Sequence, residues 1–366
     1  MEVTSKILDD DKTAGAPPRR RVHAQIPDDK AMLRAAVELT RDLNDARPEI
    51  YWPDMLGSAF VGYAALAGAI MVDNVWLALA LGVVSMLALY RALLFIHEIS
   101  HLHRDALPGF RTAWNLLVGI PMLTPSFMYE NVHTLHHART RYGTVEDPEY
   151  MPLALMKPWS LPLFVLIAAL APVALIIRFG LLTPLGLIFP PVRRFAWERV
   201  SALAINPDFR RRPETGATRS RFLWLEAGAS IWAITLVTLV IAYGAWRPLL
   251  IAMAVTSGVA VFNQLRTLVA HLWENDGETM TVTAQYLDSV NVPPPGMLPG
   301  LWAPVGLRYH ALHHLIPSTP YHSLHEAHRR IREHLGAGST FDEANHPGLV
   351  HLVLRIARST MGRPQA

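Results

Sequence analysis

The sequence contains no cysteine, and this absence excludes several kinds of site. Without thiols there is no disulfide, no thiolate-bound zinc or iron–sulfur cluster and no cysteine nucleophile. Charged residues are also scarce, at 17% of the 366 positions, against about 25% in soluble domains. A net charge of +3 does not indicate a nucleic-acid-binding protein. The chain is instead 51% hydrophobic and carries 17 histidines, so the apolar runs and the histidines are the features to explain.

The first 50 residues are polar, and this part of the sequence has no apolar run. We therefore expect no secretory signal peptide there. A helix-like pattern covers residues 28–43, which we expect to form a surface helix of a polar arm. Basic side chains dominate the beginning of this arm, namely Lys12, Arg19, Arg20, Arg21 and Lys30.

Four long apolar runs follow, and they form two pairs. The runs cover residues 55–72, 75–96, 222–243 and 249–270. A short polar turn separates the members of each pair, Asp73-Asn74 in the first and residues 244–248 in the second. Because a membrane-spanning helix needs about 20 apolar residues, the pattern predicts two transmembrane helical hairpins. Two buried helix pairs in a soluble core would need more polar sequence to cover them than the chain offers.

A third apolar region lies between the pairs. Residues 160–177 are long enough to cross a membrane once, whereas residues 181–192 are too short and contain three prolines. A single crossing would place the histidines before this region and those after it on opposite sides of the membrane. We therefore predict that residues 160–192 re-enter, lie in the membrane interface or cross twice.

Positive charge predicts the orientation. The connection before the second hairpin is rich in arginine, at positions 193, 194, 199, 210, 211, 212, 219 and 221. The two hairpin turns together have a single positive charge, Arg247. The positive-inside rule therefore places both termini and this connection in the cytoplasm. The same arginines are suited to anionic lipid or to an acidic electron carrier, although the positive-inside bias alone explains them.

The histidines cluster where the apolar runs end. Three groups share helical spacing: His97 and His101; His133, His136 and His137; and His310, His313 and His314. A single histidine, His271, ends the fourth run. Because residues three or four apart share a helix face, each group can point in one direction. The second and fourth helices return to the same face of the membrane, so the predicted topology brings His97 and His271 to similar depth.

Nine imidazoles exceed the needs of one metal ion and suit two ions with four or five nitrogens each. Neutral imidazole binds iron, copper, zinc or nickel, so the spacing alone does not choose the metal. Iron suits a reaction of oxygen with an apolar substrate at the membrane edge. The carboxylates of Glu98, Asp147, Glu149 and Asp276 are candidates to orient the imidazoles through their second nitrogen.

Other histidines are not expected to be ligands. His103 follows the first group and is interpreted as an outer or surface residue. A period-three run is expected to lie on a hydrogen-bonding or surface helix, with its members His322, His325 and His328. The His346-Pro347-Gly348 sequence resembles a haem-binding motif of cytochrome b5, but Leu349 follows it and too little chain remains for a haem domain.

These motifs resemble the integral-membrane fatty acid desaturase family, which includes related hydroxylases and ketolases. The resemblance covers about residues 55–335 and rests on HEISH (97–101), HTLHH (133–137) and HALHH (310–314), in that order around two apolar hairpins. RTLVAH (266–271) is similar to the extra histidine motif at the end of the family's fourth helix. Residues 307–324 are similar to the third-box region of bacterial acyl desaturases.

The resemblance implies a diiron centre, dioxygen as cosubstrate and two electrons from a carrier. Carried over residue by residue, it gives as metal ligands His97, His101, His133, His136, His137, His271, His310, His313 and His314. Four residues before the fourth-helix histidine, acyl-CoA desaturases have an asparagine that helps to hold water at a metal. This chain has Thr267 there, with Asn263 one turn earlier. With no haem domain, the electron donor is expected to be a separate ferredoxin- or cytochrome-type protein.

The sequence thus predicts an all-α polytopic membrane protein with two transmembrane hairpins and a cytoplasmic helical cap that carries the histidine boxes. Residues 1–50 form a cytoplasmic arm, 51–335 a membrane-embedded desaturase-like catalytic domain, and 336–366 a cytoplasmic tail. The expected activity is oxygen-dependent desaturation of a fatty acyl chain, as a lipid or a thioester, with no nucleic-acid partner. A lipid hydroxylase or carotenoid-type oxygenase with the same site is the alternative. A metal transporter fits less well, because the histidines lie past the ends of the apolar runs.

Overall fold

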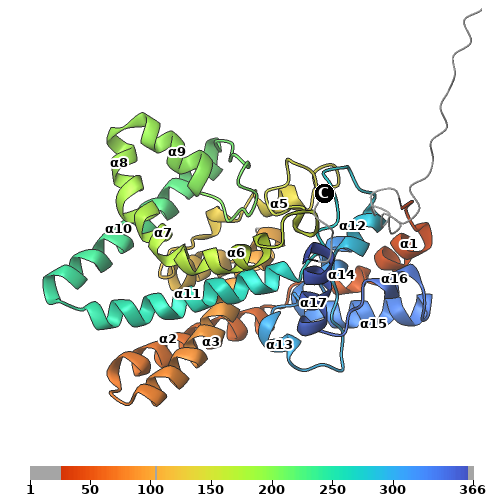
Figure 1. The fold of residues 1–366 in the computed structure, drawn as a ribbon, viewed down its shortest axis with the longest axis horizontal. Coiled ribbons are helices and arrows are strands. Elements are labelled where there is room, and N and C mark those ends of the chain that lie inside the picture. Colours follow the sequence, from red (N-terminus) through yellow and green to blue (C-terminus); the bar gives the residue numbers. More distant parts are fainter. Residues whose placement is uncertain (1–25, 104, 362–366) are drawn as a thin grey trace, which may run out of the picture.

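The computed structural model describes residues 26–361 with the exception of residue 104, and these residues form helices without any strand. The basic positions 12, 19, 20 and 21 of the polar arm lie outside the described residues. The long helices and the helices of residues 160–200 lie on one side of the molecule, and the helices of residues 30–38 and 282–361 gather on the other (Figure 1). The longer helices are α1 (Lys30–Glu38), α2 (Pro48–Met71), α3 (Val75–His101), α9 (Pro190–Val200), α10 (Gly216–Tyr243), α11 (Trp246–Leu268), α15 (Leu324–Leu335) and α17 (Leu349–Met361). The helices of four to seven residues are α4 (Phe110–Trp114), α5 (His133–His136), α6 (Ser160–Leu166), α7 (Ala171–Ile177), α8 (Thr183–Ile188), α12 (Val282–Asp288), α13 (Pro299–Trp302), α14 (His310–Leu315) and α16 (Thr340–Glu343).

Five helical runs of the described chain are long and apolar enough to cross a membrane. Four of them are α2, α3, α10 and α11, which contain the four predicted apolar runs. The fifth is the continuous run Ser160–Ile188. The predicted all-α fold, with helices long and apolar enough to span a membrane, is confirmed for the described residues. Large apolar side chains such as Phe60, Trp76 and Ile231 are 67–77% exposed, as a surface that faces lipid requires.

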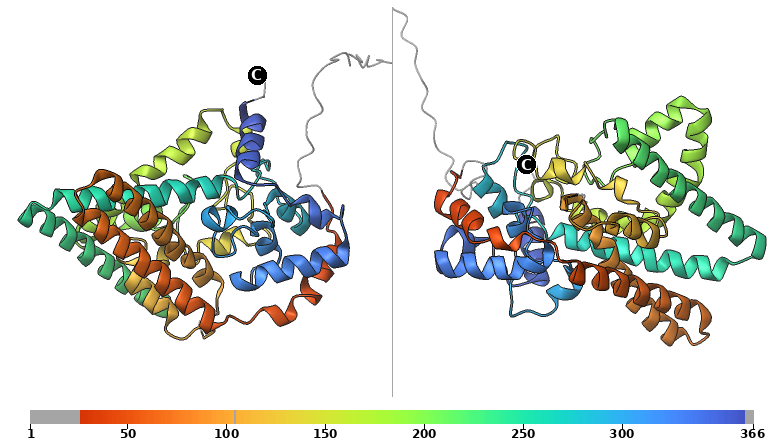
Figure 2. Two further views of the ribbon diagram at one scale, coloured as in Figure 1. Left: turned by 90° about the horizontal axis from the view of Figure 1, so that it is seen from below. Right: turned by 180° about the vertical axis from the view of Figure 1, so that it is seen from behind.

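Small residues allow α2 and α3 to pack closely side by side (Figure 2). A stripe on α2 is buried against α3 and consists of Ala59, Gly62, Ala65 and Ala69. Ser85 Oγ of α3 donates a hydrogen bond to the Gly62 carbonyl at 2.8 Å. The predicted polar turn is the N-cap of α3, where the Asn74 side chain accepts from the backbone N–H groups of Trp76 and Leu77. Such small-residue contacts are the usual basis of helix association in membranes.

We expect Gly62→Ala to destabilise the protein by about 1–3 kcal/mol, the usual cost of overpacking. A Cβ at Gly62 would lie 2.6 Å from Leu89 Cδ2 and 3.1 Å from the Leu89 backbone nitrogen. Gly57→Ala is the matched control, because nothing lies within 4 Å of its Cβ position. Thermal unfolding of the two variants in one detergent measures the difference. An equal melting temperature for both would contradict close packing at Gly62.

Residues 160–200 pack along α11 and α10 and then turn back. The run Ser160–Ile188 is bent by a 3-10 turn at Ile167–Leu170 and a π-helical turn at Arg178–Leu182, and α9 then folds back along α8. After α9, the Ile205 N–H donates to the Pro148 carbonyl at 2.9 Å. The chain before this segment and the chain after it therefore lie side by side, while re-entry, a position in the membrane interface or a double crossing of residues 160–192 stays a prediction.

Several arginines of the predicted basic connection point into the protein. Arg211 is 3% exposed and donates to the carbonyls of Phe127 and Ser201. Arg193 forms an ion pair with Glu226 on α10, at 2.7 Å. Arg221 pairs with the buried Glu130 at 2.8 Å. These three side chains hold α9 and α10 against the body, so they are not available to lipid or to a carrier as the charge pattern alone suggested.

The helices α1 and α12–α17 lie together at the other end of the molecule and form a cover of short helices (Figures 1 and 2). Met32 of α1 and Ile331 of α15 share a small core, and Arg330 pairs with Asp42 at 2.7 Å. The predicted N-terminal arm therefore packs on the C-terminal part of the chain. The predicted tail contains α17, whose Leu352 and Ile356 belong to the main core.

Candidate metal centre

The three histidine boxes and His271 meet at one place, between the long helices and the cover of short helices. His97 and His101 lie in the last turns of α3, the second box is on or next to α5, and the third box is on α14. His271 follows the end of α11. In each of two groups, one possible ligand atom per residue lies within 4.8 Å of the others. The groups are His97, His101, His133, His137 and His313, and His136, His271, His310 and His314.

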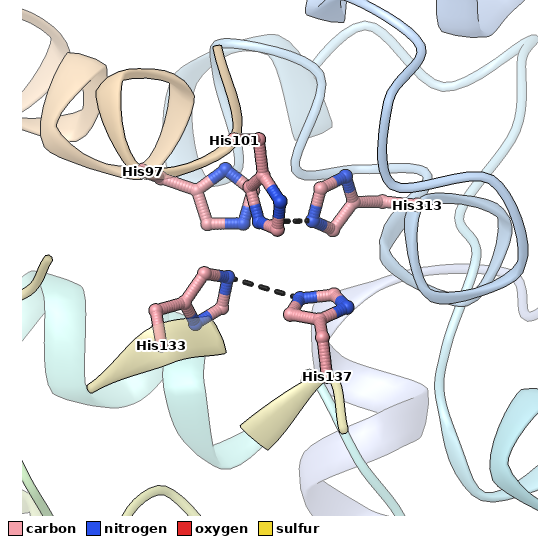
Figure 3. Close-up of side chains that lie close together, drawn as sticks. All are labelled: His97, His101, His133, His137 and His313. Atoms are coloured by element: carbon pink, nitrogen blue, oxygen red, sulfur yellow. Dashed lines mark hydrogen bonds between the residues drawn. The ribbon is translucent and has the colours of Figure 1, made fainter. Parts of the chain in front are cut away.

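The five-histidine group brings together three separate parts of the chain (Figure 3). His97 and His101 come from one helix, while His313 faces them from α14. The Nε2 atoms of His101 and His313 are 3.0 Å apart. The Nε2 atoms of His133 and His137 are also 3.0 Å apart. The rings therefore turn their nitrogens toward a common point.

The four-histidine group has the same character. His310 Nε2 lies 3.1 Å from His271 Nε2 and 3.2 Å from His314 Nε2. The His136 ring completes the group, with its centroid 5.1 Å from that of His271 and 4.8 Å from that of His314. The two groups are neighbours, because the rings of His137 and His314 are stacked with centroids 4.2 Å apart.

The outward nitrogens of three histidines meet hydrogen-bond acceptors. His133 Nδ1 lies 2.8 Å from Glu149 Oε1, and His136 Nδ1 lies 2.9 Å from Asp147 Oδ2. His271 Nδ1 lies 2.8 Å from the Tyr142 hydroxyl, which itself donates to an Asp288 carboxylate oxygen at 2.9 Å. These partners place the proton on Nδ1 and leave a lone pair on Nε2, the arrangement found at metal-bound histidines.

The inward nitrogens fit a bound cation. Two Nε2 atoms that each carry a lone pair cannot hydrogen-bond to each other at about 3 Å. This arrangement is instead suited to a positive ion between them. Burial lowers the pKa of six of these imidazoles, which favours the neutral, ligand-competent form of His133, His137, His271, His310, His313 and His314. For His136 burial acts in the same direction, but the Asp147 carboxylate outweighs it and raises the pKa.

The charged residues around the two histidine groups also suit bound metal cations. Three buried carboxylates lie around the histidines, those of Glu98, Asp147 and Asp288, and Glu149 is largely buried. Burial raises the pKa of Glu149 to about 7, so a nearby positive charge is needed to keep its carboxylate fully ionised. Two divalent ions would balance these four carboxylates while the histidines stay neutral.

The residues that contact the histidines from outside the two groups were only partly predicted. Asp147 and Glu149 contact ligand candidates as expected, and Glu98 lies 3.7 Å from His97 Nδ1. Asp276 is exposed instead. Sequence reasoning missed Tyr142 and Asp288, because Tyr142 follows the second box without any motif and Asp288 ends the short helix α12 far along the chain.

The histidines that the sequence analysis set aside at positions 103, 322, 325 and 328 lie apart from the two groups. His103 is 81% exposed at its side chain and lies beside Asp105. His325 Nδ1 contacts the Tyr309 hydroxyl at 2.7 Å, and His328 Nε2 contacts Asn345 Oδ1 at 2.9 Å. His322 Nε2 accepts a hydrogen bond from the Arg47 backbone. This run is used in hydrogen bonds within the cover of short helices.

Helices of membrane-spanning length together with two groups of possible metal ligands are typical of membrane metalloenzymes. The chain matches the fatty acid desaturase family model over residues 74–343, and it belongs to that family. The resemblance noted in the sequence is thereby confirmed.

A relative in this family has a more specific name. The chain is 46% identical over 327 residues to a ceramide hydroxylase of Caulobacter vibrioides (strain NA1000 / CB15N), a match that covers 89% of this chain and 93% of that protein. No solved structure gives a significant match to the chain.

Proposed function

We propose that the protein is an oxygen-dependent membrane hydroxylase of ceramide or a closely related lipid. The observation that carries the proposal is the pair of histidine groups at the ends of long apolar helices. The choice of hydroxylation is supported by the ceramide hydroxylase that matches nearly the full length of the chain. Desaturation of an acyl chain, the sequence-based prediction, is the second candidate, and the description of the family model supports it.

The proposed ligands are the nine predicted histidines. One iron ion is assigned to the five-histidine group and the other to the four-histidine group. Imidazole nitrogen is a suitable ligand for iron, and the paired Nε2 atoms are directed inward in both groups. Iron bound there supplies the oxidation of an unactivated C–H bond by dioxygen and two electrons, which no protein side chain can perform.

The residues of the chain hold and orient this centre. Asp147 and Glu149 keep the Nδ1 protons of His136 and His133 in place, so that Nε2 faces inward. Asp288 acts on His271 through the Tyr142 hydroxyl. Overall, a C–H bond, dioxygen, two electrons and two protons give an alcohol and water. The electrons are expected from a separate ferredoxin- or cytochrome-type carrier.

We also propose the predicted topology, with α2–α3 and α10–α11 as transmembrane hairpins and the metal centre on the cytoplasmic side. The positive-inside pattern supports the orientation. The return of residues 160–200 to Pro148 supports a segment that re-enters or crosses twice. The position of the histidines at helix ends, rather than along the helices, supports an enzyme over a metal transporter.

Expression of the full chain in a host supplied with ceramide, followed by lipid mass spectrometry, tests the function. Ceramide that gains one oxygen atom is the expected product. Ceramide or another acyl lipid that loses two hydrogen atoms would instead support desaturation. His313→Ala serves as the inactive control for host enzymes. An unchanged lipid profile, despite iron-loaded protein and a working electron donor, would contradict both candidates.

A further inference from the structure

A small cavity lies beside the four-histidine group. Its volume is about 10 Å³, and its wall includes His310, Arg266, Arg308 and Trp302. A space of this size holds a single water-sized group rather than an alkyl chain. The cavity therefore suits one oxygen atom with hydrogen-bonding capacity.

Two donors in this wall have no acceptor. Arg266 Nε is buried and has no hydrogen-bond partner among the described residues. His310 Nδ1 is also buried without a partner, in contrast to the Nδ1 atoms of His133, His136 and His271. Because His310 Nε2 faces the other histidines, its proton is on Nδ1. Buried donors are nearly always paired, so the wall lacks an acceptor.

The cavity is also positively charged. Arg266 lies in the apolar helix α11, donates to Asn263 Oδ1 at 3.3 Å and hydrogen-bonds the Tyr90 hydroxyl, but no carboxylate of the described residues pairs with it. Arg308 donates to the carbonyls of Val292 and Gly296 and likewise has no ion pair within the described chain. An ionised group inside a membrane helix is costly and marks a functional site.

We propose that this cavity binds one acceptor oxygen of the lipid's polar head, the amide carbonyl or a hydroxyl of a ceramide, through Arg266 and the Nδ1–H of His310. This inference rests on the proposed function. An oxygen held beside His310 fixes the position of the chain relative to the metal ions, so that one carbon is oxidised. Arg266 is in this sense a specificity-determining residue.

The surroundings of the cavity suit a lipid that arrives from the bilayer. Trp302 is the last residue of α13, and Tyr90 of α3 donates to its carbonyl at 2.8 Å. Just before α13 in the sequence, Met297 and Leu298 are 88% and 71% exposed. In Figure 1, α13 lies near the ends of α3 and α11 where the long helices meet the short ones. Apolar side chains at this level are suited to the membrane interface.

The test compares wild type, Arg266→Gln and Arg266→Lys as iron-loaded full chains in lipid nanodiscs that contain ceramide. For Arg266→Gln we expect KM to rise about 10- to 100-fold, as for the loss of a charged hydrogen bond. The hydroxyl should also appear at more than one carbon, with kcat and iron content nearly unchanged. Arg266→Lys keeps the charge and should restore part of the affinity. Arg247→Gln is the matched control, because Arg247 is an exposed arginine in the first turn of α11, at the opposite end of this helix from Arg266.

Two ceramide analogues identify the oxygen, one with the amide reduced to an amine and one without the 3-hydroxyl. The Arg266→Gln effect should vanish for the analogue that lacks the bound oxygen. An unchanged KM and a single hydroxyl position in Arg266→Gln would overturn the inference while leaving the proposed function intact. If wild type oxidises no ceramide, the proposed function fails. Binding of radiolabelled ceramide to metal-free wild type and Arg266→Gln then decides the inference separately, with equal binding overturning it.

Discussion

Replacing His313 with alanine is expected to abolish hydroxylation and to lower the bound iron from about two ions to about one per chain. His313 faces His101 across the five-histidine group, with Nε2 atoms 3.0 Å apart, and it is 2% exposed. Alanine removes one ligand and leaves a buried gap that water fills poorly. His136→Ala should do the same to the four-histidine group. Product analysis and iron determination on the purified variants measure both effects.

His325→Ala is the matched control for this experiment. His325 is exposed on α15 and contacts Tyr309 rather than either histidine group. We expect His325→Ala to keep two irons and near wild-type activity. Of the alanine variants at positions 322, 325 and 328, we expect at least two to behave in this way. Full activity in His313→Ala or His136→Ala would refute the assignment of that residue as a ligand.

The structure brings the nine predicted histidines together, but it divides them in a way that the sequence did not predict. Each box was expected to point in one direction, yet the structure divides the second and third boxes between the two groups. His133 and His137 lie in one group and His136 in the other. Likewise His310 and His314 lie together, apart from His313. On a helix with 3.6 residues per turn, residues four apart differ in direction by about 40°, residues three apart by about 60° in the opposite sense, and neighbours by about 100°. His133 and His137 can therefore share a group that His136 does not join.

This division has a structural consequence. Because α5 and α14 each supply histidines to both groups, neither group can be displaced without the other. Spacing identifies the residues of such a box, but which of them share a metal depends on how two short helices face each other. That arrangement depends on contacts distant in sequence, such as the hydrogen bond from the Ala311 N–H to the Val290 carbonyl.

The local pattern of apolar residues was sufficient to predict the long helices, but it was insufficient to predict the irregular parts of the chain. Apolar runs of bilayer length predicted α2, α3, α10 and α11 to within seven residues at each end. The sequence placed Arg211 only among the arginines of a basic connection, but its side chain is buried and its guanidinium donates to the carbonyls of Phe127, Ser201 and Glu130. Counting charges along the sequence does not distinguish a buried arginine of this kind from an exposed one.

Asp147→Asn is expected to weaken iron binding by the four-histidine group about 10- to 100-fold, the usual effect of removing the partner of a metal-bound histidine. Both oxygens of Asp147 are used, since the backbone N–H of Gly143 donates to Oδ2 and that of Glu149 donates to Oδ1. Both also lie within 3.0 Å of His136 Nδ1. An asparagine has only one oxygen, so its NH2 group would face a backbone donor and the side chain would turn. His136 would then lose the acceptor that fixes its proton on Nδ1.

Iron retention against a chelator, followed for each ion separately by Mössbauer spectroscopy, measures this effect. In Asp147→Asn the iron of the four-histidine group should be lost first, whereas Glu149→Gln should affect the five-histidine group through His133. Glu146→Gln is the control, because Glu146 lies in the same loop with its side chain 63% exposed. Equal loss of both irons in Asp147→Asn would mean that the carboxylate stabilises the loop as a whole. The opposite selectivity of the two variants is expected only if each carboxylate acts through its own histidine.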